Sequence, residues 1–195
     1  MRLDPNRDRD SFPKRAQLPI VAGTPEGSAW FWGGSDELDR LNLLTSRGVL
    51  LDVFNWAQTY DSFTDHHITA SDLKSCAESQ GAAFQTGDIL LIRTGWLERY
   101  NGLTLEQKQE RSTWDIMQHR YAGLEASGDM KNFLHNSYFA AAATDSASLE
   151  IWSPTNSEAS LHATLLPLWG MPVGELWDLE ALSLRCRQER RWTFC

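Results

Sequence analysis

Two residues that could carry chemistry, His162 and Glu175, flank the most apolar stretch of the chain. An ionised carboxylate beside a buried segment must be paired, protonated or bound to a metal, because a lone buried charge is strongly destabilising. Imidazole and carboxylate together suit Zn²⁺ or Mn²⁺, and they can also act as a general acid and base. On spacing alone, two satisfied polar residues of the core are the more frequent explanation.

The stretch between these residues predicts how they are positioned. It cannot form one continuous helix, because it contains Pro167, Gly170, Pro172 and Gly174. We therefore expect a short helical turn from His162, a bend near Trp169 and Gly170, and a buried strand that ends at Glu175. In this arrangement His162 and Glu175 face one interior space.

A second candidate group follows the apolar run Ile89–Ile92, which is typical of a buried strand. Its carboxyl end delivers Arg93, Thr94 and Trp96, and such strand ends are where α/β folds place their sites. We take these three as candidate substrate-binding residues. Arg93 could bind a substrate carboxylate or carbonyl, and an ion pair with an acid of the core explains it equally well.

The remaining elements follow from periodicity and caps. Thr69 and Asp72 form a capping-box variant before a helix over Ala70–Gln80, which Gly81 closes. The other expected elements are a strand at Val49–Leu51, a surface helix within Leu103–Met117 that leaves His119 exposed, a helix over Leu124–Asn136 with His135 near its end, a strand over Tyr138–Thr144 followed by a polar turn from Asp145, and a last helix over Leu179–Arg190.

The loop Asp61–His67 is a second possible source of metal ligands, because it holds two imidazoles and two carboxylates. Its histidines, His66 and His67, are adjacent. In an extended chain adjacent side chains point to opposite faces, so both cannot easily reach one ion.

Composition bounds the class of protein. A formal net charge of -8 and a pI near 5.1 leave no basic surface for phosphate backbones, so we expect no nucleic-acid partner. No window has the apolar length of a transmembrane helix, and residues 1–13 are charged rather than signal-like, which predicts a cytoplasmic protein that does not enter membranes. Three widely spaced cysteines favour free thiols. We expect an extended arm over residues 1–27 and one α/β domain over residues 28–195.

The stretch from Ser160 to Glu180, S-L-H-x-x-L-L-x-L-W-G-M-P-x-G-E-L-W-D-L-E, resembles the C-terminal signature of the cyclase family of metal-dependent hydrolases. That family includes bacterial kynurenine formamidase, and the likeness is greatest to its fungal branch. Further segments of the chain resemble segments of family members in the same order, namely residues 27–33, 41–45, 47–52, 87–96, 122–125 and 140–150. The resemblance implies a mixed sheet with flanking helices, called a swivelling β/β/α domain. It also implies a small-molecule substrate with an amide or lactone carbonyl, His162 and Glu175 as metal ligands, and Asp145 as a residue that shapes the substrate site.

One large departure concerns the metal. Family members carry their remaining ligands, H-x-G-T-H-x-D or W-D-x-x-x-H, in a long segment that this chain replaces with Thr45-Ser46-Arg47. The domain is thus internally truncated and the Zn or Mn ligand set is incomplete. Two hypotheses follow: a hydrolase or cyclase that completes its site across a subunit interface or works through His162 and Glu175 alone, or a metal-free binding or partner subunit. A gene model that has lost an exon at this junction would explain the same gap. Because the deletion should uncover apolar surface, we expect a homodimer.

Overall fold

The protein is described from a computed structural model, which places residues 14–18, 47–153 and 160–195. The expected arm over residues 1–27 therefore lies outside the described residues, except for residues 14–18. The motifs at residues 27–33 and 41–45 also lie outside them, as does most of the junction that joins the two motifs around Ser46.

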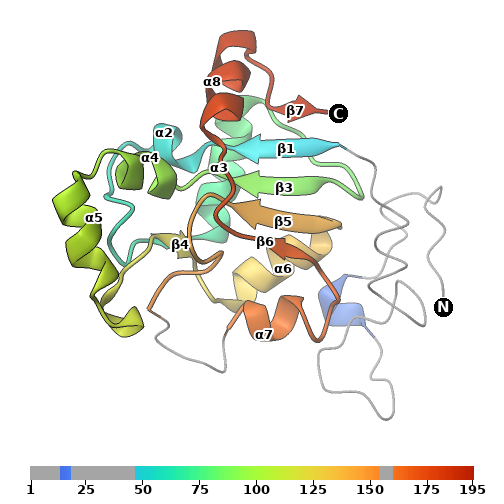
Figure 1. Cartoon of the computed structure of the whole chain (residues 1–195). Coiled ribbons are helices and arrows are strands. Elements are labelled where there is room, and N and C mark those ends of the chain that lie inside the picture. Colours follow the sequence, from blue (N-terminus) through green and yellow to red (C-terminus); the bar gives the residue numbers. More distant parts are fainter. Residues whose placement is uncertain (1–13, 19–46, 154–159) are drawn as a thin grey trace.

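A five-stranded mixed sheet in the order β6-β5-β3-β1-β7 forms the centre of the molecule (Figure 1). Four strands run parallel and β7 runs antiparallel to its neighbour β1. The strands are β1 (Gly48–Leu51), β3 (Ile89–Ile92), β5 (Ala141–Thr144), β6 (Val173–Gly174) and β7 (Thr193–Phe194). The predicted α/β class with a mixed sheet and flanking helices is confirmed.

Helices cover both faces of this sheet. The helices and 3₁₀ turns are η2 (Arg15–Gln17), α2 (Val53–Ala57), α3 (Ala70–Gln80), α4 (Trp96–Asn101), α5 (Leu105–Ser112), η4 (Ile116–Gln118), α6 (Gly128–Asn136), α7 (His162–Leu165) and α8 (Glu180–Glu189). A separate pair of short parallel strands, β2 (His67–Ile68) and β4 (Gly123–Leu124), lies beside the main sheet. Among the described residues, no helix has the length and apolar character needed to cross a bilayer.

The alternation of side chains along the strands divides the core in two. Val49 and Ile92 point to the face covered by α3 and α6, where they join the larger hydrophobic cluster. Leu50 and Leu91 point to the opposite face and pack with Leu179 and Cys186 at α8. The strands are buried on both faces, which explains why they read as continuous apolar runs in the sequence.

Local signals predict α3 well. The Thr69 hydroxyl accepts a hydrogen bond from the backbone N–H of Asp72, and the Asp72 carboxylate accepts one from the backbone N–H of Thr69. Gly81 closes the helix in the left-handed conformation at φ 63°. The prediction of a helix over Ala70–Gln80 is therefore confirmed, and so is that of a strand over Ile89–Ile92.

Two predicted elements begin later in the chain than expected. The helix placed over Leu124–Asn136 starts at Gly128, because Leu124 pairs with Ile68 in the small sheet and Ser127 caps the helix. The strand placed over Tyr138–Thr144 starts at Ala141, because Tyr138 adopts a left-handed φ of 57° that ends the preceding helix. Tertiary pairing and turn geometry overrode apolar periodicity in both places.

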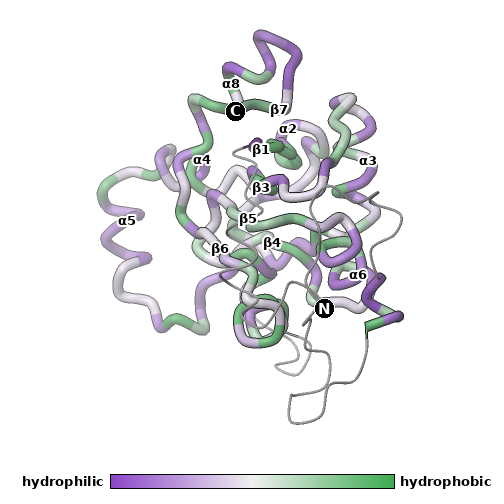
Figure 2. Tube along the Cα trace, turned by 90° about the vertical axis from the view of Figure 1, so that its right-hand side faces the viewer, coloured by the Kyte–Doolittle hydropathy of each residue, from purple (hydrophilic) through white to green (hydrophobic). Residues whose placement is uncertain are grey.

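The polar excursion after β3 forms α4, α5 and η4 away from the sheet (Figure 1). The predicted surface helix within Leu103–Met117 is confirmed as α5, whose trace is largely hydrophilic (Figure 2). The chain then returns through β4 to the centre of the molecule.

Gly123 in β4 gives a test of this packing. A Cβ at this position would lie 2.5 Å from the backbone carbon of Glu150, and a backbone cannot move aside as a flexible side chain can. We expect Gly123→Ala to lower the free energy of unfolding by about 1–3 kcal/mol in urea denaturation. Gly128→Ala is the matched control, since a Cβ there meets nothing within 4 Å. Equal stability of the two variants would contradict this packing.

Candidate functional site

The imidazole of His162 lies between two carboxylates. Its Nδ1 is 2.8 Å from Oε1 of Glu150, and its Nε2 is 3.1 Å from Oε1 of Glu175. The sequence predicted that His162 and Glu175 face one interior space. The structure brings them together, but at the surface of a cavity, where their side chains are 34% and 31% exposed. Glu150 is the third member of the cluster.

Glu150 is fixed by several donors from the start of α7. It is 7% exposed, and its carboxylate accepts hydrogen bonds from the Ser160 hydroxyl at 2.8 Å and from the backbone N–H of Leu161 at 2.5 Å. The backbone N–H of His162 also donates to Oε1 of Glu150 at 3.3 Å. The carboxylate therefore holds both the first turn of the helix and the ring of its first residue.

The segment between His162 and Glu175 folds as the prolines and glycines predict. The helical turn α7 ends at Leu165, and Gly170 makes the bend with a left-handed φ of 57°. Strand β6 then pairs with β5 and ends one residue before Glu175, but it is two residues long and half-buried rather than buried as predicted, because it is the edge strand of the sheet. Oε1 of Glu175 accepts a hydrogen bond of 2.7 Å from the backbone N–H of Leu149. Glu175 is thus tied to the segment that carries Glu150, and Glu150 to the segment that carries His162.

The charges of the three groups reinforce one another. The hydrogen bonds to Glu150 and then Glu175 raise the pKa of His162 to about 10, against the opposing effect of burial. Burial alone would raise the pKa of each carboxyl, but the hydrogen bonds from His162 and from backbone N–H groups hold both below their usual value. At neutral pH the cluster is an imidazolium between two carboxylates.

A cavity of about 550 Å³ opens beside this cluster. Its walls are mostly apolar, and the charged residues lie together on them. The lining residues are Ile116, Tyr121, Ala147, Ser148, Glu150, Trp152, Ser160, His162, Ala163 and Glu175. The indole N–H of Trp152 donates to the carbonyl of Ile116 at 3.0 Å, so one aromatic wall is fixed to η4.

The donor atoms are of the right kind for a metal ion. An ion held by Nε2 of His162 and a carboxylate oxygen at about 2 Å in tetrahedral geometry separates those ligands by roughly 3.3 Å, close to the spacing found here. Glu150 bonds the other ring nitrogen, as carboxylates commonly do behind a histidine ligand. Within the described residues no group of three His, Cys, Asp or Glu side chains could hold an ion. His162 and Glu175 therefore fit as two ligands of an incomplete set.

Arg93 is 1% exposed and lies away from this cavity, in a network of acids. Its guanidinium donates to Asp52 at 3.0 Å and to Glu180 at 2.7 and 2.9 Å, and it also pairs with Glu98. Burial alone would lower the pKa of Arg93, but these partners hold it above its ordinary value. Of the two explanations left open by the sequence, the structure shows the ion pair with a core acid, Asp52, joined by the partly exposed Glu180 and Glu98.

The other predicted substrate-binding residues brace the start of α4. Asp145 is fully buried and accepts hydrogen bonds from the backbone N–H and hydroxyl of Thr94 at 2.6 and 2.9 Å. Burial raises the pKa of Asp145, and these donors oppose that shift. Trp96 stacks on Tyr100 and meets Tyr121 edge-on at 5.9 Å. Because Tyr121 lines the cavity, Trp96 supports its wall from behind.

The remaining histidines do not gather at one point. The ring of His66 stacks on Tyr60 at 4.3 Å, whereas Nδ1 of His67 lies 3.8 Å from Glu125. His119, expected to be exposed, is half-buried between Trp114 and Tyr121, and His135 is buried against Trp169 at the end of α6.

Comparison with known proteins gives the family. Residues 24–151 match the family model "Cyclase", whose description is "Putative cyclase". The chain belongs to the cyclase family. A solved crystal structure of a novel cyclase aligns with a TM-score of 0.63 and 29% sequence identity over 76% of this chain. The alignment covers 45% of that solved chain, so the present chain spans less than half of its length. None of the curated proteins compared with the chain matches it.

Glu150 is the site residue that the sequence did not single out in this member of the family. It lies at the end of the family-like run 140–150. The available signal was a carboxylate inside an apolar run, Leu149 to Ile151, where an ionised group needs a partner. Its partner lies 12 residues further along the chain, beyond the reach of any local pattern.

The raised pKa of His162 predicts how stability depends on pH in the metal-free protein. The folded state holds the imidazole proton more tightly than the unfolded state, whose pKa is near the ordinary 6.5. The contribution of this proton is fully present below pH 6.5 and is lost as the pH rises through about 10. Urea denaturation in a chelator should therefore show a steeper loss of stability over this range for the natural chain than for His162→Gln. Parallel curves would contradict the ion cluster.

Replacement of Arg93 should act on folding. Arg93→Met leaves the buried carboxylate of Asp52 without its cation, and breaking a buried pair in this way costs about 3–5 kcal/mol. Arg99→Met removes an exposed pair with Asp61 and should cost at most about 1 kcal/mol. Denaturation midpoints measure both, and equal midpoints would show that the Arg93 network contributes little.

Proposed function

We propose that this cyclase-family chain hydrolyses an amide or lactone carbonyl of a small apolar molecule, or forms such a bond in the reverse, cyclising direction. The observation that carries the proposal is the imidazole of His162, held between Glu150 and Glu175 on the wall of a mostly apolar cavity. Such a site joins proton-transfer groups to a binding surface, which is what carbonyl hydrolysis needs.

The residues support a balanced sequence of proton transfers. Glu175 accepts a proton from water as the water oxygen bonds to the carbonyl carbon. The carbon–nitrogen bond of an amide then breaks, and the departing nitrogen takes the proton from Nε2 of His162. The proton on Glu175 returns to the imidazole across 3.1 Å and restores the starting state. Glu150 positions the ring by its bond to Nδ1.

The cavity favours a planar aromatic substrate. Tyr121 and Trp152 contribute aromatic walls and Ile116 an aliphatic one, while the charged groups lie together. An aryl formamide fits this division, with its ring against the apolar walls and its carbonyl toward His162. N-formylkynurenine is the aryl formamide that the family resemblance suggests, and a secondary-metabolite lactone is the alternative substrate.

A metal ion would be held by His162 and Glu175, with further ligands from outside the described residues or from a second copy of the chain. When bound, Zn²⁺ or Mn²⁺ would polarise the carbonyl and lower the pKa of water. Glu150 would then fix the ring so that Nε2 faces the ion.

The direct test is an assay of the purified chain on N-formylkynurenine, simpler aryl formamides and aryl lactones, with and without added Zn²⁺ or Mn²⁺. His162→Ala and Glu175→Gln should each lower kcat/KM by at least about a hundredfold, as expected for loss of a general acid or base. Glu150→Gln should lower kcat about 10–100-fold with little change in KM, because it positions the ring. Glu189→Gln, on the exposed side of α8, is the control. Activity that survives His162→Ala would refute the proposal.

Metal content separates the two ways of working. With only His162 and Glu175 as ligands, zinc should be lost on dialysis, because two ligands leave the ion mostly hydrated. If a second copy or another segment completes the shell, metal analysis should return about one ion per chain, and His162→Ala should remove it. Light scattering on the same sample tests the expected homodimer. An ion that survives both His162→Ala and Glu175→Ala would show that these residues are not its ligands.

A binding or partner subunit is the second candidate function. Two observations favour it. The described residues supply two candidate ligands, fewer than the three that a catalytic zinc site needs. The chain also spans 45% of the length of the solved relative. In that case the chain should bind aryl ligands in the His162 cavity without turnover, and His162→Ala should change affinity alone. Turnover by the natural chain decides between the two functions.

A further inference from the structure

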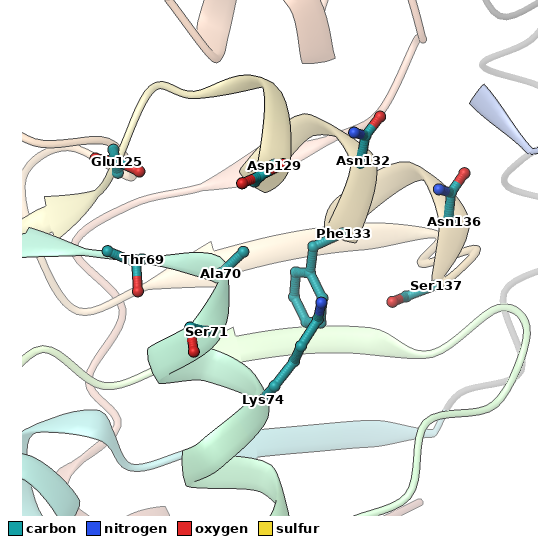
Figure 3. A pocket seen from close by; sticks show the side chains of 10 residues that line it. All are labelled: Thr69, Ala70, Ser71, Lys74, Glu125, Asp129, Asn132, Phe133, Asn136 and Ser137. Carbon is teal, nitrogen blue, oxygen red and sulfur yellow. The ribbon is translucent and has the colours of Figure 1, made fainter. Parts of the chain in front are cut away.

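A second cavity, of about 650 Å³, lies between the first half of α3 and the outer side of α6 (Figure 3). It shares no lining residue with the cavity beside His162. The residues that line it are Thr69, Ala70, Ser71, Lys74, Glu125, Asp129, Asn132, Phe133, Asn136 and Ser137. The proposed hydrolysis does not use any of them.

Acceptors gather at one end of this cavity. Figure 3 shows the carboxylates of Glu125 and Asp129 on the side toward β4 and the start of α6. Glu125 has only a 3.8 Å contact with His67, and Asp129 forms no ion pair within the described residues. Two carboxylates that have few ion-pair partners among the described residues favour binding of a cationic group of a ligand.

Donors gather at the other end. The Lys74 side chain extends along the Phe133 ring, and its ammonium lies on the same side as the Ser137 hydroxyl (Figure 3). Ser137 is 8% exposed, and its hydroxyl bonds to no other described group. Lys74 forms no ion pair with the part of the chain that the structure describes. An ammonium and a free hydroxyl suit an anionic group.

The surface between the two ends is aromatic and rigid. Phe133 is 6% exposed and meets the rings of Phe84 and Phe139 at 5.8 Å, both in edge-on contacts. A ring fixed in this way offers an apolar surface to a ligand without losing its own freedom on binding.

The α6 wall is also held in place from outside. The side chain of Arg15 donates to Oδ1 of Asn132 at 3.0 Å, and the backbone N–H of Arg15 donates to Oδ1 of Asn136 at 2.8 Å. Both amide oxygens are therefore occupied, and both amide N–H groups are left for other acceptors. These contacts fix the side of α6 that faces Arg15.

From this arrangement we propose that the cavity binds an α-amino acid with an apolar side chain as its zwitterion. The ammonium group lies toward Asp129 and Glu125, the carboxylate toward Lys74 and Ser137, and the side chain on the Phe133 ring. A simple anion would use only the donor end and a simple cation only the acceptor end. A neutral polyol would leave both sets of charges unpaired, which is unfavourable once water is displaced.

Calorimetric titration of the full chain tests this with L-phenylalanine and two analogues, 3-phenylpropanoate without the ammonium and 2-phenylethylamine without the carboxylate. L-phenylalanine should bind, and each analogue should bind at least about tenfold more weakly, since each lacks one of the two charged groups that the cavity would pair. No binding of L-phenylalanine at millimolar concentration would overturn the proposal. So would equal affinity for all three ligands.

Variants assign the two ends. Lys74→Met should weaken L-phenylalanine binding at least about tenfold and leave 2-phenylethylamine binding unchanged, because that analogue has no carboxylate. Asp129→Asn should weaken L-phenylalanine binding by a similar factor and leave 3-phenylpropanoate binding unchanged, because that analogue has no ammonium group. Glu110→Gln, which changes an exposed charge on α5 away from this cavity, should alter neither. Lys74 and Asp129 are exposed, so both variants should fold, which circular dichroism checks. Unchanged affinity for L-phenylalanine in both variants would refute the site. The outcome is independent of the hydrolase assay, because His162 is not involved.

Discussion

The buried charge of Arg93 is the constraint on which the arrangement of this chain depends. A guanidinium that is 1% exposed must be neutralised within the protein, because an unpaired interior charge is far more destabilising than any single contact is stabilising. Its partners come from separate parts of the chain: Asp52 follows β1, and Glu180 opens α8. The Ser183 hydroxyl adds a bond of 2.5 Å to Asp52. The last helix is thereby fixed to the end of the central strands.

Arg93 is one member of a row. Each of the four parallel strands is followed at once by an ionisable residue: Asp52 after β1, Arg93 after β3, Asp145 after β5 and Glu175 after β6. Because the carboxyl ends of parallel strands meet at one edge, these residues lie along the same border of the sheet. The first three are used to fix α8 and the start of α4, whereas Glu175, at the outer strand, faces a cavity. The three residues that follow the inner strands therefore have structural contacts, and the residue that follows the edge strand β6 is the one that reaches the cavity.

This row also explains what the sequence could predict. Strands buried on both faces and a capped helix such as α3 are encoded within a few residues, so Ile89–Ile92 and Ala70–Gln80 were predicted with their bounds. The turn, bend and strand from His162 to Glu175 follow from the positions of Pro and Gly. The contact of Glu150 with His162 and the pairing of Leu124 with Ile68 depend on segments brought together only by folding. The choice between a ligand-binding and a core-paired Arg93 likewise required its partners in space.

The two ways in which His162 could work are two states of one nitrogen. In the proposed function, Nε2 would carry either a proton, shared with Glu175 at 3.1 Å, or a metal ion, for which Glu175 would be the second ligand. Glu150 serves both states, since its bond to Nδ1 stabilises an imidazolium and also orients a neutral ring. A metal ion would have to displace the proton on Nε2, and the pKa of His162 is raised to about 10. The two carboxylates that would attract the ion also stabilise the protonated ring, so they favour both competitors. Further ligands would shift this balance toward the ion. With His162 and Glu175 as the sole ligands, we expect the ring to keep its proton at neutral pH, because both carboxylates raise its pKa.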